Sequence, residues 1–197
     1  MTDLYSRVVC DSADRDNWMR VRRSGLGASD VARYANPESL PSYVRAKLTH
    51  GTFTGNPHTE RGHRLEAPIL ASQGMTQNTL MFHAEDEPLF FATPDAVVSP
   101  TQGAQVKTTV HTAGRRVRIP AAHRRQMQWE CYVCGFDTVD YIVLRFDGDG
   151  NPLTLEPERI VFDRDDAEIR TILNIARPVL AALTEALTFE RMEGPKS

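Results

Sequence analysis

Short β-prone segments fill the middle of the chain, with helical segments on both sides of them, and this order limits the folds open to the sequence. Runs bounded by Pro, Gly and charged turns predict strands. They lie at residues 80–83, 89–93, 96–99, 104–109, 139–146 and 159–162. We therefore expect a mixed α/β fold, with a small central mixed β-sheet flanked by helices.

Helices are predicted from the spacing of apolar residues and from the residue types that begin and end helices. They lie at residues 14–23, 29–34, 40–50, 57–73, 121–134 and 163–189. Ser29, Asn56 and Asp163 are the expected N-caps. Pro68 and Pro178 lie inside predicted helices, so we expect a kink or a break at each.

The length and the apolar pattern set the expected organisation. With 197 residues the chain is long enough for one well-buried domain, 1–197, with a core at 18–135 and a strand and helix at 136–197 that complete it. No apolar run approaches the roughly 20 residues that span a bilayer, and the first residues lack the apolar stretch of a secretory signal. We expect a cytoplasmic protein with no membrane partner, located in the bacterial host cytoplasm if a phage encodes it.

The three cysteines, Cys10, Cys131 and Cys134, are too few and of the wrong parity for a disulfide framework. Cys131 and Cys134 form a C-x-x-C inside a predicted helix, where residues three apart share one face. Since no second Cys/His pair has metal spacing, packing on a buried helix face is favoured over zinc or an iron–sulfur cluster.

Charge is unevenly distributed along a chain whose net charge is −3. Residues 96–129 contain no Asp or Glu. Their basic side chains are Lys107, Arg115, Arg116, Arg118, Arg124 and Arg125, with His111 and His123 nearby. Such a tract can contact phosphate groups, and a solvated basic loop explains it equally well.

Asp95, Gln105 and Lys107 form the arrangement with the clearest chemistry. Gln105 and Lys107 are two apart in a predicted strand, so both project to one face, and the carbonyl of Val106 between them can point toward a metal ion. If residues 96–99 and 104–109 pair as a hairpin, Asp95 lies beside them. Phosphodiester hydrolysis needs a cation held by carboxylates, an activated water and a group that offsets phosphate charge. Taken alone the pattern is weak evidence, because it occurs by chance in many proteins.

Five short motifs follow one another between residues 18 and 132. They are Trp18-x-x-x-Arg22 with Gly25-Leu26-Gly27-Ala28-Ser29-Asp30, Arg61-Gly62-His63-Arg64-Leu65-Glu66, Thr93-Pro94-Asp95, Gln105-Val106-Lys107 and Gln128-x-x-x-Tyr132. In this order they resemble the motifs of the YqaJ-type viral recombinases, a lambda-exonuclease-like family of the PD-(D/E)XK nuclease superfamily. The last 60 residues add only a plausible strand and helix.

The resemblance implies an exonuclease that depends on Mg²⁺, with Mn²⁺ able to substitute. Such an enzyme digests linear double-stranded DNA 5′-to-3′ and leaves 3′ single-stranded tails for recombination by an annealing protein. It also implies a homo-oligomeric ring. Carried over by position, the metal ligands would be Glu66, Asp95, Gln105 and the Val106 carbonyl. Lys107 would act on the water or the phosphate, Gln128 would position the substrate, and the 5′-phosphate or DNA contacts would be Arg22, Ser29, Thr93 and Tyr132.

Gln105 departs from the family pattern, which has a carboxylate at this position. A neutral amide is a weaker Mg²⁺ ligand and a much poorer general base. Three explanations are open. The chain is an active natural variant, a DNA-end-binding protein that has lost catalysis, or a deliberately substituted enzyme, and we favour the first. Two other functions stay open: a related endonuclease, and a binding module for a protein partner that uses the basic tract.

Overall fold

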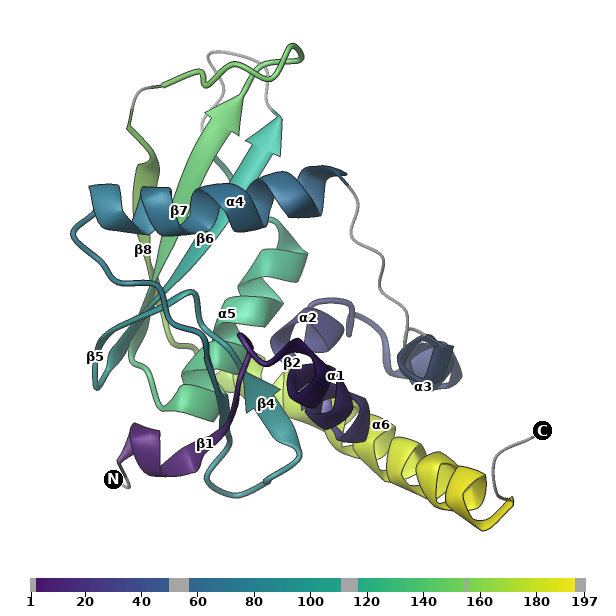
Figure 1. Ribbon diagram of the computed structural model, residues 1–197. Helices are drawn as coiled ribbons and strands as arrows, with labels where there is room; N and C mark the ends of the chain where they lie inside the picture. Colours follow the sequence, from purple (N-terminus) through teal and green to yellow (C-terminus); the bar gives the residue numbers. More distant parts are fainter. Residues whose placement is uncertain (1–2, 50–56, 111–116, 155, 194–197) are drawn as a thin grey trace.

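The computed structural model describes residues 3–49, 57–110, 117–154 and 156–193. The predicted cap Asn56, the loop at 52–56 and the basic residues at 111–116 lie outside these ranges. The fold is mixed α/β, as predicted, but its strands form two four-stranded sheets instead of one central sheet (Figure 1). The two sheets are joined through the short stretch that contains Asp95.

The first sheet has the strand order β1-β3-β4-β2. Its strands are β1 (Val8–Asp11), β2 (Leu26–Gly27), β3 (Leu80–His83) and β4 (Phe90–Ala92). β1 and β4 pair antiparallel with β3, and β2 pairs parallel with β4. Sequence analysis found β3 and β4 but missed β1 and β2.

The second sheet has the order β5-β6-β7-β8. Its strands are β5 (Ala96–Ser99), β6 (Gln102–Val110), β7 (Thr138–Phe146) and β8 (Glu158–Asp163). β5 and β6 form the expected antiparallel hairpin, with Ala96 opposite Ala104. β6 and β7 run parallel over nine residue pairs, and the crossover between them contains α5.

Six α-helices and two short 3₁₀ helices complete the described part of the chain. The α-helices are α1 (Arg15–Ser24), α2 (Ala28–Val31), α3 (Leu40–Thr49), α4 (Pro57–Ser72), α5 (Ala121–Cys134) and α6 (Asp166–Glu193), and the 3₁₀ helices are η1 (Leu4–Arg7) and η2 (Pro37–Ser39). α4 and α6 continue through Pro68 and Pro178, so the expected breaks are absent from both.

Two of the predicted N-caps are wrong. Ser29 lies inside α2, and the Asp30 carboxylate accepts a hydrogen bond from the Gly27 N–H at the start of that helix. Asp163 still belongs to β8, and the cap of α6 is Asp165, whose Oδ1 accepts from two backbone N–H groups of the first turn. The helix therefore begins where the strand pairing ends.

The second sheet is covered on both faces. Even-numbered residues of β6 and β7 face α4 and form a small cluster with it, composed of Ile69, Leu70, Ala96, Ala104, Val106 and Ile142. Odd-numbered residues of β7 face α5 and α6 and belong to the largest cluster, which includes Trp129, Tyr141 and Val143. Figure 1 shows α4 crossing in front of β6 and β7. Side chains on β6 thus point toward one helix or the other by alternation.

α6 is long and apolar enough, by length and composition alone, to cross a membrane. Its apolar residues are interrupted by Arg170, Arg177 and Glu185, so the helix is not an unbroken apolar run. In the structure one face of α6 packs in the largest cluster through Ile169, Ile172, Ile175, Val179 and Leu183. Burial of that face accounts for the apolar composition of this half of the helix.

Candidate active site

Asp95 lies at the turn between β4 and β5, where the two sheets meet. Its backbone N–H donates to the Ala104 carbonyl at 3.0 Å, which extends the hairpin by one residue. Its Oδ2 accepts hydrogen bonds from the Val106 N–H, at 2.6 Å, and from the Gln105 side-chain amide. The predicted placement of Asp95 beside Gln105 is confirmed.

Val106 presents its backbone to Asp95. The N–H and C=O groups of one strand residue point to the same edge of the strand. Because the Val106 N–H binds Asp95, the Val106 carbonyl also points to that edge, while the Val106 side chain is buried against α4. A carbonyl and a carboxylate therefore meet at one point, and both are oxygen donors of the kind that Mg²⁺ takes.

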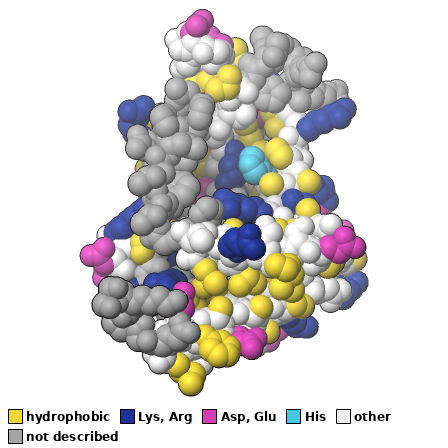
Figure 2. Space-filling model, turned by 90° about the vertical axis from the view of Figure 1, so that its right-hand side faces the viewer, with side chains coloured by type: hydrophobic (Ala, Val, Ile, Leu, Met, Phe, Trp, Pro, Cys, Tyr) yellow, Lys and Arg dark blue, Asp and Glu magenta, His cyan; other side chains and the backbone are white. Residues whose placement is uncertain are grey.

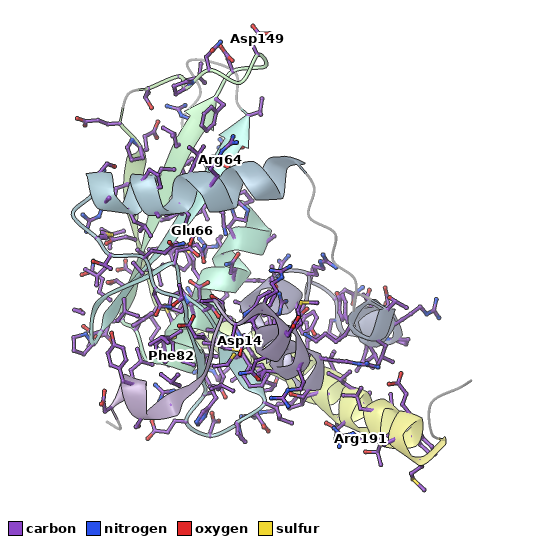
Figure 3. All side chains as sticks on the ribbon, viewed as in Figure 1. Asp14, Arg64, Glu66, Phe82, Asp149 and Arg191 are labelled. Carbon is purple, nitrogen blue, oxygen red and sulfur yellow. The ribbon has the colours of Figure 1, made fainter. Side chains whose placement is uncertain are left out.

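Glu66 approaches the same point from α4. The Glu66 charge raises the pKa of Asp95, after burial, which is the largest cause, and the Lys107 charge and the Val106 N–H oppose the rise. The result is a pKa of about 7 for Asp95. Figure 3 shows Glu66 on the side of α4 toward the body of the protein, and Arg64 on the opposite side. The Gln77 amide holds Glu66 through a 2.8 Å hydrogen bond to Oε1.

Gln126 and Glu130 of α5 also reach the face of β6 that carries Gln105. The Gln126 amide donates to Gln105 Oε1 at 2.7 Å and to Glu130 Oε1 at 3.0 Å. Neither α5 residue was predicted as part of the site. Two signals were available in the sequence. Gln126 and Glu130 have i, i+4 spacing, and Glu130 is the first carboxylate after a stretch of 34 residues, 96–129, without Asp or Glu.

Gln128 and Tyr132, which were predicted to contact substrate, lie elsewhere. The Gln128 side chain is fully buried and bonds the Asp163 carbonyl and the Asp165 N–H, where it ties α5 to the start of α6. The Tyr132 hydroxyl donates to Asp86 at 2.5 Å. Residues two apart on a helix point about 200° apart, so placing Gln126 in the site excludes Gln128 from it.

Glu130 is completely buried, and its Oε2 has no hydrogen-bond partner. Burial raises its pKa to about 8, and the Asp95 charge adds to the rise. The charge of Lys107 acts in the opposite direction on both Asp95 and Glu130. Lys107 is therefore a source of compensating positive charge for both acidic groups.

His123 joins this group from the first turns of α5. Its Nδ1 lies 2.7 Å from the Tyr141 hydroxyl, and the two rings are in contact. Burial lowers the pKa of His123 to about 4, and the positive charge of Lys107 contributes. His123 is therefore neutral at physiological pH and can exchange hydrogen bonds with Tyr141 without adding charge.

The predicted 5′-phosphate residues Arg22 and Ser29 are in contact with each other. Arg22 Nη2 donates to Ser29 Oγ at 2.6 Å and lies 3.7 Å from Asp30. Lys47 of α3 forms a 2.6 Å ion pair with Asp30. Thr93, the third predicted residue, is half-buried between β4 and Asp95. Arg22, Lys47 and the Ser29 hydroxyl thus form a compact basic group with one carboxylate in it.

The cysteines are packed in the interior of the protein. Cys10, Cys131 and Cys134 are all buried free thiols, and burial raises the pKa of each. The prediction that Cys131 and Cys134 pack as apolar side chains is confirmed, since both belong to the largest hydrophobic cluster.

The donors around Asp95 fit a divalent cation by their chemistry. Two carboxylates, Asp95 and Glu66, raise the free energy of the ionised site because like charges repel, and a cation relieves this. The Val106 carbonyl adds a neutral oxygen donor. Among the described residues no three His, Cys, Asp or Glu side chains converge as a preformed metal cluster. Mg²⁺ is commonly held by one or two carboxylates with several waters, so two carboxylates suffice.

Comparison with known proteins found no matching family model and no curated protein with a significant match. Solved structures do match. The alkaline exonuclease LHK-Exo from Laribacter hongkongensis superposes with a TM-score of 0.65 at 22% identity, over 90% of this chain and 97% of that one. A structure of LHK-Exo in complex with dAMP matches equally, with a TM-score of 0.65 at 20% identity, over 88% of this chain and 95% of that one.

A phage-related exonuclease from Haemophilus somnus 129PT matches with a TM-score of 0.62 at 13% identity, over 87% of this chain and 98% of that one. At these identities the similarity establishes the fold. The chain therefore has the fold seen in this alkaline exonuclease and this phage-related exonuclease.

Proposed function

We propose that the protein is a divalent-cation-dependent exonuclease that degrades linear double-stranded DNA from its 5′ ends and leaves 3′ single-stranded tails for recombination by strand annealing. The observation that carries this proposal is the grouping of Asp95, Glu66, the Val106 backbone and Lys107 at one edge of β6, on a fold shared with exonucleases. The comparisons support a nuclease, and the polarity and the recombination role rest on the resemblance of the motifs.

In this proposal Asp95 and Glu66, with the Val106 carbonyl, hold Mg²⁺ or Mn²⁺. The bound cation would neutralise charge on the scissile phosphate and lower the pKa of water. The Lys107 ammonium lies close enough to influence both Asp95 and Glu130, and it would offset the charge that develops on the phosphate. The hydrogen bond from Val106 to Asp95 holds the carboxylate in one orientation, which keeps the donor set ready before substrate binds.

The basic group around Arg22 would bind the 5′-terminal phosphate. A guanidinium and a hydroxyl 2.6 Å apart can both donate to one phosphate, and Lys47 adds charge behind them. Figure 2 shows a hollowed face where Lys and Arg side chains gather beside histidine, with few acidic side chains around the hollow. A positively charged concave face suits the DNA backbone.

The test is a nuclease assay on linear duplex DNA with 5′-phosphate ends, with Mg²⁺, with Mn²⁺ and with chelator. We expect mononucleotides to be released only with a cation, no cleavage of closed circles, and loss of at least ~100-fold in rate for Lys107→Met, in the range found when a charge-stabilising donor is removed. Arg23→Met is a control, because it removes a cation from an exposed ion pair with Glu190, outside the Asp95 group. Cation-independent cleavage, or equal cleavage of circles and ends, would contradict the proposal.

A second function is favoured by one observation, the neutral Gln105 at the centre of the site. With an amide there, the chain could bind DNA ends without turnover. In that case end binding persists with no cleavage in either cation, and Gln105→Glu creates activity.

A further inference from the structure

Two carboxylates among the described residues are fully buried, Glu130 and Asp140, and their surroundings differ. Asp140 is compensated by the Arg159 guanidinium at 2.7 Å and by the Gln102 amide at 3.0 Å. Each carboxylate has one oxygen with no hydrogen-bond partner, but the described hydrogen bond of Glu130 comes from the neutral amide of Gln126 and not from a cation. A buried carboxylate without a cation or a full set of donors is costly, so its presence needs a reason.

Hydrogen bonds connect Glu130 to Asp95 through two amides. Glu130 Oε1 accepts from Gln126, Gln126 also donates to Gln105 Oε1, and the Gln105 amide nitrogen donates to Asp95. Gln105 has its amide oxygen toward Gln126 and its amide nitrogen toward Asp95, whereas the Gln126 nitrogen donates to both of its neighbours. The Glu130 carboxylate is thereby held against the face of β6 that carries Gln105 and Lys107.

The charge pattern agrees with this placement. The charges of Lys107 and Asp95 both act on Glu130, so the three groups lie within electrostatic range of one another. Gln105 lies between Asp95 and Gln126 and brings no charge of its own. The hydrogen-bonded group therefore has its carboxylate on the helix and an amide on the strand.

We propose that Glu130 supplies the carboxylate that position 105 lacks and acts as the third acidic group of the divalent-cation site, presented by α5 instead of β6. The inference rests on the proposed function, since it concerns the same site. Mg²⁺ keeps several of its waters in protein sites, and a carboxylate that accepts hydrogen bonds from those waters strengthens binding without direct contact. Glu130 is in this sense a positioning residue, with Gln105 and Gln126 as its connection to Asp95.

The alternative is that Glu130 is a buried acid with no role in cation binding. The two readings give different results for Glu130→Gln, which keeps the shape and removes the charge. If Glu130 only fills space, the variant binds cations as the wild type does. If Glu130 belongs to the site, cation affinity falls while the fold is retained.

The experiment is isothermal titration of the full-length protein with Mn²⁺ and with Mg²⁺, without DNA. We expect Glu130→Gln to weaken Mn²⁺ affinity by about 10-fold or more, as loss of an outer-shell carboxylate does. Glu168→Gln is the matched control, since it removes a carboxylate of α6 that forms an ion pair with Arg124 of α5. The exchange variant Gln105→Glu/Glu130→Gln returns the charge to β6, and we expect it to recover affinity to within about 3-fold of wild type, because the same outer-shell charge is restored.

The outcomes separate this inference from the proposed function. If wild type cleaves DNA but Glu130→Gln and the control bind Mn²⁺ equally, the inference is wrong and the function stands. If Glu130→Gln weakens Mn²⁺ binding but wild type never cleaves, the function is wrong and the third acidic group stands. If Glu130→Gln does not fold, the exchange variant decides: cation affinity well below wild type in a folded exchange variant overturns the inference.

Discussion

Replacing Asp95 with Asn should stabilise the metal-free protein at alkaline pH and abolish its response to Mg²⁺. Asp95 is held beside Glu66, and its pKa is raised to about 7, chiefly by burial. Asn keeps a carbonyl oxygen for the Val106 N–H and removes the charge, so the fold loses little and the repulsion from Glu66 disappears. A substitution that destroys the proposed activity is therefore expected to raise stability.

The size of the effect follows from the pKa. The folded-state pKa of about 7 lies above the ordinary value of 3.8. The favourable contribution of protonated Asp95 is therefore complete below the unfolded pKa and is lost as the pH rises through 7. At 1.36 kcal/mol for each pKa unit the full shift corresponds to ~4 kcal/mol at pH 8. Because part of Asp95 remains in contact with solvent, we expect about half of this, ~2 kcal/mol.

The assay is urea unfolding of wild type and Asp95→Asn in chelator at several pH values. The two should be nearly equally stable near pH 4, and the variant should gain an advantage that grows to pH 7 and levels off by pH 8. Excess Mg²⁺ should then stabilise wild type and leave the variant unchanged, because only a protein that binds the cation gains from it. A variant less stable than wild type at pH 8, or a difference independent of pH, would refute the reasoning.

Three further results are expected. The pKa of His123 is lowered to about 4, so the protein loses stability as the pH falls from the unfolded-state pKa of histidine toward 4. His123→Phe should make this loss of stability at acid pH smaller by ~1 kcal/mol in urea unfolding, a value that allows for the partial exposure of the ring. In Gly25→Ala, Cβ would meet the Leu89 carbonyl oxygen at 2.1 Å, and calorimetry should show a loss of about 2 kcal/mol or more. Arg22→Ala should lower the preference for 5′-phosphate over 5′-hydroxyl ends about 10-fold in competition binding, because a charge-assisted contact to phosphate is lost.

Each of these has a result that would count against it. If His123→Phe loses as much stability at acid pH as wild type does, the His123 ring is not shielded from solvent as the structure indicates. Full stability of Gly25→Ala would show that β4 can move away from residue 25. Equal loss of binding to both kinds of DNA end in Arg22→Ala would assign Arg22 to the DNA backbone instead of the terminal phosphate.

The centre of the site was predictable because its parts are close in sequence. Asp95 and Lys107 flank one hairpin, and alternation along a strand fixes which neighbours share a face. Glu66 was located by its motif, and the structure places its charge near Asp95. Helix α5 was predicted with its observed bounds, since Pro120 and Gly135 mark its two ends.

The predictions that failed concern features that depend on tertiary packing. Gln126 and Gln128 both fit a motif with one glutamine, and which of them faces β6 depends on how α5 is rotated against the sheet. The edge of the first sheet was missed because β2 is a two-residue strand that is recognisable only by its pairing with Phe90 and Phe91. Glu130 was overlooked because a carboxylate amid apolar helix residues suggests an exposed face until burial is known.

The two hydrophobic clusters imply that the two helices at the site are held with different stability. Glu66 stands on α4, whose apolar anchor is the small cluster with Ile69 and Leu70, whereas Glu130 stands on α5 within the largest cluster. A helix with a small anchor opens at lower free energy than one in the main core, so amide hydrogens of α4 should exchange with solvent sooner than those of α5. A cation shared by Glu66 and Asp95 would hold α4 in place, so slower exchange of the α4 amide hydrogens would report cation binding without any DNA.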